Sequence, residues 1–273
     1  MSITASFLQY EVAFGDHAAN AATVRRLLSD APDFDLLVLP ELAFSGYDFR
    51  DRDELHALAE PFQDGPTASL LCGLARERDA VIVAGYAERA PEGCYNSAML
   101  VCPGGAAHNY RKIHLFNREQ DVFLPGDAPP TVVDTPAGRI GMMICFDWFF
   151  PETARCLALA GAQIIAHPSN LVLPWCQRAM FARSLENAVH TITCNRIGTE
   201  ARTDRSLTFT GGSQILNTKG ETLVSAATDG ESLGVATLDP ACADSKLIAG
   251  RNDLFGDRRP ALYGDLYPGP SVL

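Results

Sequence analysis

The sequence predicts a layered α/β fold built around a mixed β-sheet, and two observations support this prediction. Segments with helical periodicity alternate with short apolar segments along most of the 273 residues, as expected where helices pack on a sheet. Turn-forming residues join other apolar segments directly, which indicates hairpins and therefore antiparallel strands. No internal repeat, low-complexity block or linker interrupts the chain. We therefore expect one domain over residues 1–273, with residues 239–273 as an extended C-terminal tail.

The first half of the chain begins with a strand and a helix, and the pattern then repeats. Residues 17–28 place Val24 and Leu28 on one helical face. Residues 36–39 are almost wholly apolar, as expected for a strand that is buried on both faces. The expected strands here are residues 3–8, 36–39, 80–86, 95–102 and 107–111, and the expected helices are residues 17–28 and 67–78.

The second half opens with a hairpin that leads to a cysteine and then returns to alternating helices and strands. Gly161 is expected to close the helix that follows this cysteine, because glycine readily adopts the left-handed conformation that ends a helix. Beyond it, frequent glycines separate short strands between residues 207 and 238. The other expected strands are residues 132–134, 139–144, 163–166 and 191–196, and the expected helices are residues 152–160 and 177–189.

Composition excludes several classes of protein. The net charge of −11 argues against binding to nucleic acid or to an anionic membrane surface. No signal peptide or bilayer-spanning apolar segment is evident, so we expect a cytoplasmic protein. Eight scattered cysteines without a CxxC pair or Cys/His ligand spacing indicate reduced thiols and no metal site. Neither GxGxxG nor a P-loop pattern occurs, so nothing indicates a nucleotide cofactor.

The stretch GMMICFDWFFPE, residues 141–152, predicts a buried strand that delivers Cys145 to a sharp turn. Pro151 then begins a helix, since proline has no N–H group to lose at the first helical position. Such an elbow presents a nucleophile and leaves backbone N–H groups free to hold an oxyanion. A single cysteine at the end of an apolar strand is more often a small core residue, so the partners of Cys145 decide the interpretation.

Three side chains are candidate activators of Cys145. Glu41 directly follows the apolar strand 36–39, and Lys112 lies where the strand 107–111 closes, among apolar neighbours. The alternative for each is an ordinary solvated charge at the rim of the sheet. His167 follows the strand 163–166 and offers a Cys–His pair instead.

Taken together, these stretches resemble the nitrilase superfamily of carbon–nitrogen hydrolases. The matching blocks are LPELAFSGYDF, YRKIHLF with Glu119 and FLPGD downstream, GMMICFDWFFPE, AHPSNLV and RSLENAV. The resemblance covers nearly the whole chain. It implies a four-layer α-β-β-α sandwich, and homodimers that join the sandwiches across helices, including the one after the nucleophile.

The resemblance also implies roles for individual residues. Cys145 would be the nucleophile, Glu41 the general base, Lys112 an oxyanion stabiliser or acid, and Glu119 a supporting glutamate that orients Lys112. The N–H group of Phe146 would complete the oxyanion site. A thioester on Cys145 would form and then be hydrolysed, with no metal or organic cofactor and no necessary role for His167.

Aromatic residues in these blocks favour a small, partly apolar pocket, and we expect Tyr47, Phe146 and Trp148 to contact the substrate. Small neutral aliphatic amides are the expected substrates. Nitriles are the first alternative and N-carbamoyl amines the second. The alternative from a different class is an inactive family member that serves as a binding protein. The pair Phe146–Asp147 follows the nucleophile where a Trp-Glu pair is common in nitrilases of the family, which favours the amidase.

Overall fold

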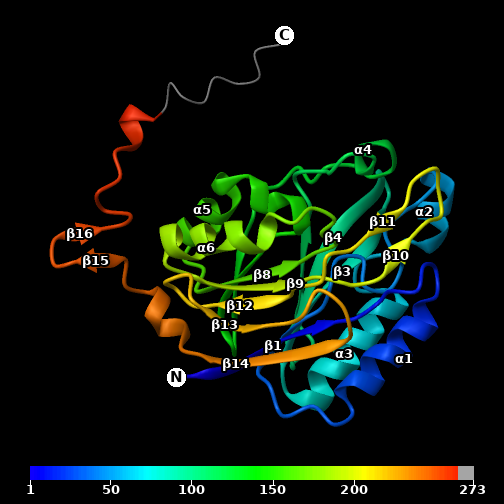
Figure 1. Cartoon of the computed structure of the whole chain (residues 1–273), viewed down its shortest axis with the longest axis horizontal. Helices are drawn as coiled ribbons and strands as arrows, with labels where there is room; N and C mark the ends of the chain where they lie inside the picture. The colour runs from blue at the N-terminus through cyan, green and yellow to red at the C-terminus, as the bar shows by residue number, and fades with distance from the viewer. Residues whose placement is uncertain (264–273) are drawn as a thin grey trace.

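The computed structural model describes residues 1–263, and within them two six-stranded mixed sheets pack face to face with helices on both outer faces (Figure 1). This is the four-layer α-β-β-α sandwich that the sequence blocks implied, so the predicted fold class is confirmed. The alternating pattern had predicted one mixed sheet, which is wrong. A strand with two apolar faces has the same pattern whether a helix or a second sheet covers each face.

The first sheet contains the strands of the first half of the chain and one late strand. β1 pairs in parallel with β2, and β2 in parallel with β3, whereas β3, β4 and β5 form antiparallel hairpins and β14 is antiparallel to β1. The strand order is β14 (Ser232–Leu238), β1 (Ile3–Gln9), β2 (Leu36–Val38), β3 (Val81–Ala90), β4 (Gly93–Val101) and β5 (Ala107–Arg111).

The second sheet is formed by the later strands. β7, β8 and β9 are parallel neighbours, and β6 and β12 flank them in the antiparallel direction. The strand order is β13 (Thr222–Ser225), β12 (Gln214–Leu216), β9 (His190–Cys194), β8 (Ile164–Pro168), β7 (Gly138–Met142) and β6 (Val132–Thr135).

Helices cover the two outer faces. α1 (His17–Leu28) and α3 (Pro66–Arg78) pack on the first sheet, and α5 (Pro151–Leu159) and α6 (Cys176–Asn187) pack on the second (Figure 1). Strand β2 shows how the sequence specifies both faces. Leu36 and Val38 lie in the core between the sheets, whereas Leu37 lies in the core beneath α1 and α3, since successive side chains alternate across a strand.

Short elements lie outside the two sheets and the four covering helices, and several of them were not predicted from the sequence. Helices α2 (Arg52–Leu58) and α4 (Glu119–Val122) and the 3₁₀ helix η1 (Cys145–Phe149) are too short for a periodic pattern. The other short elements are β10 (Thr199–Glu200), β11 (Leu207–Thr208), β15 (Leu247–Ala249), β16 (Asn252–Asp253), η2 (Pro240–Ala243) and η3 (Pro260–Leu262).

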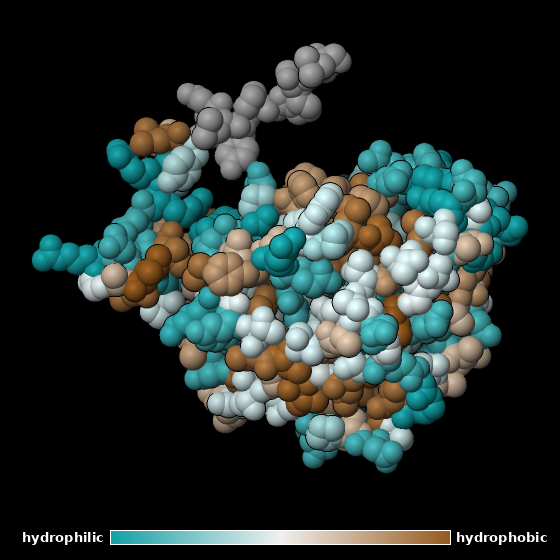
Figure 2. All heavy atoms as spheres, in the orientation of Figure 1, coloured by the Kyte–Doolittle hydropathy of each residue, from teal (hydrophilic) through white to brown (hydrophobic). Residues whose placement is uncertain are grey.

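Beyond β14 the chain leaves the sandwich, and the small hairpin β15–β16 projects from the body (Figure 1). Leu247 and Ile248 in this segment are largely exposed, and Figure 2 shows a hydrophobic patch on it. Of the extended tail expected over residues 239–273, residues 264–273 lie outside the described part of the chain. None of the helices found between residues 1 and 263 has the length and apolar character needed to cross a bilayer.

Candidate active site

Cys145 lies at a strained turn between strand β7 and helix α5. Its φ angle is +40°, in the left-handed region that side chains other than glycine rarely adopt. The residue opens η1, and Pro151 occupies the first turn of α5, as the sequence predicted. Such a turn leaves the first N–H groups of η1, including that of Phe146, without an acceptor inside the helix.

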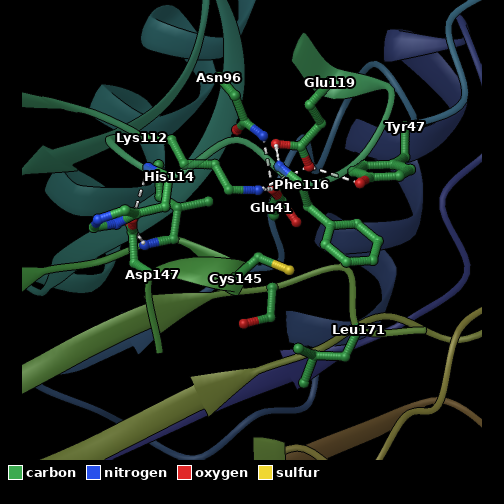
Figure 3. A network of polar contacts seen from close by, with 12 residues as sticks. Glu41, Tyr47, Asn96, Lys112, His114, Phe116, Glu119, Cys145, Asp147 and Leu171 are labelled. Atoms are coloured by element: carbon green, nitrogen blue, oxygen red, sulfur yellow. Dashed lines mark hydrogen bonds and ion pairs between the residues drawn. The ribbon is translucent and has the colours of Figure 1, made fainter. Parts of the chain in front are cut away.

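Glu41, Lys112 and Glu119 form one buried ionic cluster (Figure 3). The Lys112 ammonium group lies 2.7 Å from Glu41 Oε1 and 2.8 Å from Glu119 Oε1. Figure 3 shows the sulfur of Cys145 pointing toward this cluster. The Glu41 Oε1 atom also accepts a 2.6 Å hydrogen bond from Asn96 Nδ2, whereas its Oε2 atom is buried and has no partner. The free oxygen of Glu41 is therefore available to take a proton.

Close contacts of the backbone fix the positions of Lys112 and Glu41. The Lys112 N–H group donates to the Asn96 carbonyl group at 2.8 Å, which sets Lys112 directly beyond β5. Gly85 of β3 allows the loop that carries Glu41 to approach, because a Cβ atom at Gly85 would lie only 2.4 Å from the Cα of Glu41. These contacts hold Glu41 and Lys112 in position before any substrate binds.

Burial and charge act differently on the three ionisable groups. Burial raises the pKa of Glu41, although Lys112 opposes the shift. Burial alone would lower the pKa of Lys112, but the carboxylates of Glu119 and Glu41 outweigh it and raise that pKa above its usual value. Burial, and then the negative charge of Glu41, raise the pKa of the Cys145 thiol well above 9. The Cys145 side chain is therefore a neutral thiol at pH 7.

Glu119 is held by two donors besides Lys112. The Tyr47 hydroxyl group donates to Glu119 Oε1 at 2.6 Å, and the Phe116 N–H group donates to Oε2 at 3.1 Å. The Tyr47 loop is itself fixed from the other side, because Glu200 accepts the N–H group of Tyr47 and forms a buried ion pair with Arg196. Tyr47 does not line the cavity beside Cys145 described below, so its expected contact with substrate stays a prediction.

Asp147 organises the turn that carries Cys145, a role that sequence reasoning missed. Its Oδ2 atom accepts the N–H group of Ile144 at 2.9 Å and the hydroxyl group of Tyr110 at 2.8 Å. Its Oδ1 atom lies 2.8 Å from Nδ1 of His114, whose ring stacks on Phe150 at 3.7 Å between centroids. Asp147 thus joins the elbow to the segment just after Lys112. The available signal was one acidic residue in the apolar run CFDWFF.

His167 does not contact the sulfur of Cys145 in this arrangement. Its Nε2 atom lies 2.9 Å from the carbonyl oxygen of Cys145, and its Nδ1 atom lies 3.1 Å from Thr193 Oγ1. Burial lowers the pKa of His167 to about 4, so the ring is neutral at pH 7 and supports the backbone of the elbow. Within residues 1–263, no group of three or more His, Cys, Asp or Glu side chains is placed to hold a metal ion.

A small cavity lies beside Cys145 and is mostly apolar. Figure 3 shows Phe116 and Leu171 next to the sulfur. The predicted contact residues Phe146 and Trp148 line the cavity, and none of the described residues that line it is charged. Arg183 of α6 is not among the residues that line the cavity. Its Nε atom donates to the carbonyl oxygen of Trp148 at 3.0 Å. The lining consists of Phe116, Cys145, Phe146, Trp148, Asn170, Leu171, Val172 and Leu173.

Known proteins share this sequence pattern and fold. The family model described as carbon-nitrogen hydrolase matches residues 4–246. A protein of Pyrococcus abyssi called nitrilase is 47% identical over 228 residues, which are 84% of this chain and 86% of that protein. An (R)-stereoselective amidase of Pseudomonas sp. is 37% identical over 256 residues, which are 92% of this chain and 89% of that protein.

A solved structure gives the same result for the fold. A glutamate-to-glutamine variant of the amidase from Nesterenkonia sp. AN1 matches with a TM-score of 0.81 and 26% identity, over 96% of each chain. In that variant, the acetamide moiety of fluoroacetamide is covalently attached to the active-site cysteine.

Proposed function

The chain belongs to the carbon–nitrogen hydrolase family, and on this premise we propose that it hydrolyses small neutral aliphatic amides to carboxylic acids and ammonia. Family membership, with relatives called nitrilase and amidase, makes it an enzyme with a thiol nucleophile. The presence of Glu41, Lys112 and Cys145 argues against the alternative of an inactive family member that serves as a binding protein. The observation that supports the choice of substrate is the small uncharged cavity beside Cys145. A pocket without a charged group leaves a charged substrate without a partner.

In the proposed acylation step, Glu41 Oε2 takes the proton of the Cys145 thiol, and the sulfur attacks the amide carbon. The carbonyl oxygen becomes an oxyanion between the Lys112 ammonium group and the N–H group of Phe146. Donors fixed in a buried site stabilise such developing charge more than they would in water. Glu41 then passes the proton to the departing nitrogen, the C–N bond breaks, and ammonia leaves a thioester on Cys145.

In the proposed deacylation step, Glu41 removes a proton from water, which attacks the thioester carbon. The oxyanion forms between the same two donors, and its collapse breaks the C–S bond. The proton returns to the Cys145 sulfur, and the carboxylic acid leaves. Glu119 has no proton to transfer in this scheme. Its hydrogen bond from Tyr47 and its ion pair with Lys112 support the role of orienting the ammonium group.

Small neutral nitriles are the second candidate substrates, and a specific observation favours them. The relative with 47% identity is called a nitrilase. A nitrile would form the same thioester after addition of the sulfur, addition of water and loss of ammonia, so the catalytic residues alone do not choose between the two classes.

Steady-state kinetics on propionamide and propionitrile, with ammonia as the measured product, test this choice. We expect the specificity constant for propionamide to exceed that for propionitrile. A tenfold preference for the nitrile, which is about 1.4 kcal/mol of transition-state stabilisation, would contradict the amide assignment and leave the proposed roles of Glu41, Lys112 and Cys145 intact.

We also propose that residues 1–273 act as one catalytic domain that assembles as a homodimer or higher oligomer. Large apolar side chains are exposed on η1 and on the two helices of the second sheet, namely Phe149, Leu159, Phe181 and Leu185. The projecting segment from Asp239 onward adds Leu247, Ile248 and Leu262. Exposed apolar groups of this kind are typical of surfaces that associate, which supports a subunit contact across α5 and α6 and along the tail.

A further inference from the structure

Asn170 has an unusual position in the cavity beside Cys145. The residue is 2% exposed, and both its Nδ2 and its Oδ1 atoms are buried without a hydrogen-bond partner. Among the residues that the structure describes, no other side chain leaves two buried polar atoms unpaired. An unpaired buried amide destabilises a folded protein, so such groups usually have a partner or serve a ligand.

The backbone around Asn170 is fixed on both sides. The Ser169 N–H group donates to the Cys194 carbonyl group at 2.8 Å, and the Leu171 N–H group donates to Asn195 Oδ1 at 2.8 Å. Asn170 and Cys145 both line the small cavity described above. The unpaired side chain is therefore held at a defined position next to the nucleophile, as a binding group should be.

We propose that Asn170 is a specificity-determining residue whose Oδ1 atom accepts an N–H group of the substrate's carboxamide. This inference rests on the proposed amide hydrolysis and adds the residue that recognises the leaving nitrogen. Phe116, Phe146, Trp148, Leu171 and the other apolar lining residues offer no side-chain acceptor for that nitrogen. The Oδ1 atom of Asn170 is an unused acceptor in this lining. An ester or a nitrile has no N–H group to donate and gains nothing from it.

Two substrates that form the same propionyl thioester separate this role from a structural one. Propionamide carries the N–H groups, whereas p-nitrophenyl propionate lacks them and reports acylation as a burst of p-nitrophenolate. Asn170→Leu replaces the amide by an apolar group of similar size. If the leucine disturbs folding, Asn170→Ala removes the amide without introducing a clash. Asn187→Leu is the matched control, because Asn187 Oδ1 is also buried and unpaired but lies outside the cavity lining, at the end of α6.

We expect each Asn170 variant to lose at least about tenfold in kcat/KM for propionamide, while the acylation rate with the ester changes less than about threefold. Tenfold corresponds to about 1.4 kcal/mol, the scale of one hydrogen bond to the substrate. Asn187→Leu should leave the ratio of the two rates unchanged. Parallel losses with both substrates, or no loss with either, would overturn the inference. A wild-type enzyme that the ester acylates but that leaves propionamide intact would contradict the proposed function itself, and this inference with it.

Discussion

Replacing Lys112 by methionine should affect stability as well as turnover, because the ammonium group lies between two buried carboxylates. It is 2.7 Å from Glu41 Oε1 and 2.8 Å from Glu119 Oε1, and its side chain is fully buried. Removal of one partner from a buried ion pair typically costs about 3–5 kcal/mol, since the remaining charge has neither partner nor water. We therefore expect Lys112→Met to lower the free energy of unfolding by about that amount.

A second substitution tests the reason for this loss. Glu119→Gln in the Lys112→Met background removes one of the two uncompensated carboxylates and keeps an acceptor for the Tyr47 hydroxyl group. The double variant should therefore be more stable than the sum of the single changes predicts, by about 2 kcal/mol, the scale found for groups in one network. It should remain inactive, because the oxyanion still lacks its cation.

Urea unfolding at pH 7 measures the free energy of unfolding of Lys112→Met, Glu119→Gln and the double variant. Ammonia release measures their turnover. Lys219→Met is the matched control, since Lys219 is exposed and its replacement should change stability by less than about 0.5 kcal/mol. A Lys112→Met variant as stable as the control would refute the description of Lys112 as the cation that compensates two buried carboxylates. Simple additivity in the double variant would refute the coupling between Lys112 and Glu119.

The remaining predictions concern the base, the elbow and the assembly. Glu41→Gln should reduce kcat by at least about a hundredfold, as loss of a general base does, and the protein should remain folded by circular dichroism. Because burial raises the pKa of Glu41 and the base acts when deprotonated, wild-type kcat/KM should fall as pH decreases through a value above 4.5. His167 has a pKa of about 4 when folded and about 6.5 when unfolded, so the unfolded state alone binds its proton between these values. Urea unfolding should show a loss of about 3 kcal/mol as pH falls from 6.5 to 4, and His167→Asn should remove most of this loss while reducing turnover far less than Glu41→Gln does. Light scattering should find a dimer or larger species, and a stable, fully active monomer at assay concentrations would contradict the proposed assembly.

The sequence was sufficient for most of the fold because hydrophobic periodicity is a local property. Residues 17–28 were predicted as a helix with the bounds that α1 has, and residues 107–111 as a strand with the bounds of β5. The division of the strands into two sheets was not predictable from these patterns, because a covering sheet and a covering helix demand the same apolar face. The resemblance of whole sequence blocks supplied that information instead.

The candidate site shows a similar limit. Glu41, Lys112 and Cys145 each had an ordinary alternative as isolated residues, and only their joint match to known blocks selected them. Their contacts join residues 71 positions apart in the case of Lys112 and Glu41, which no local pattern specifies. Asn96 and Asn170 were missed for the same reason. The function of a polar residue in or after an apolar strand depends on the segments that pack against it in the folded protein.

The central claim is that the carbon–nitrogen bond is broken through an acyl thioester on Cys145. Acid quenching of the enzyme during propionamide turnover, followed by peptide mass spectrometry, tests it most directly. We expect one propionyl group on the peptide that contains Cys145, and its conversion to propionohydroxamate when hydroxylamine is added before quenching. A folded Cys145→Ala variant should give neither product nor adduct. A propionyl group on another residue, or substantial ammonia release by Cys145→Ala, would contradict the account.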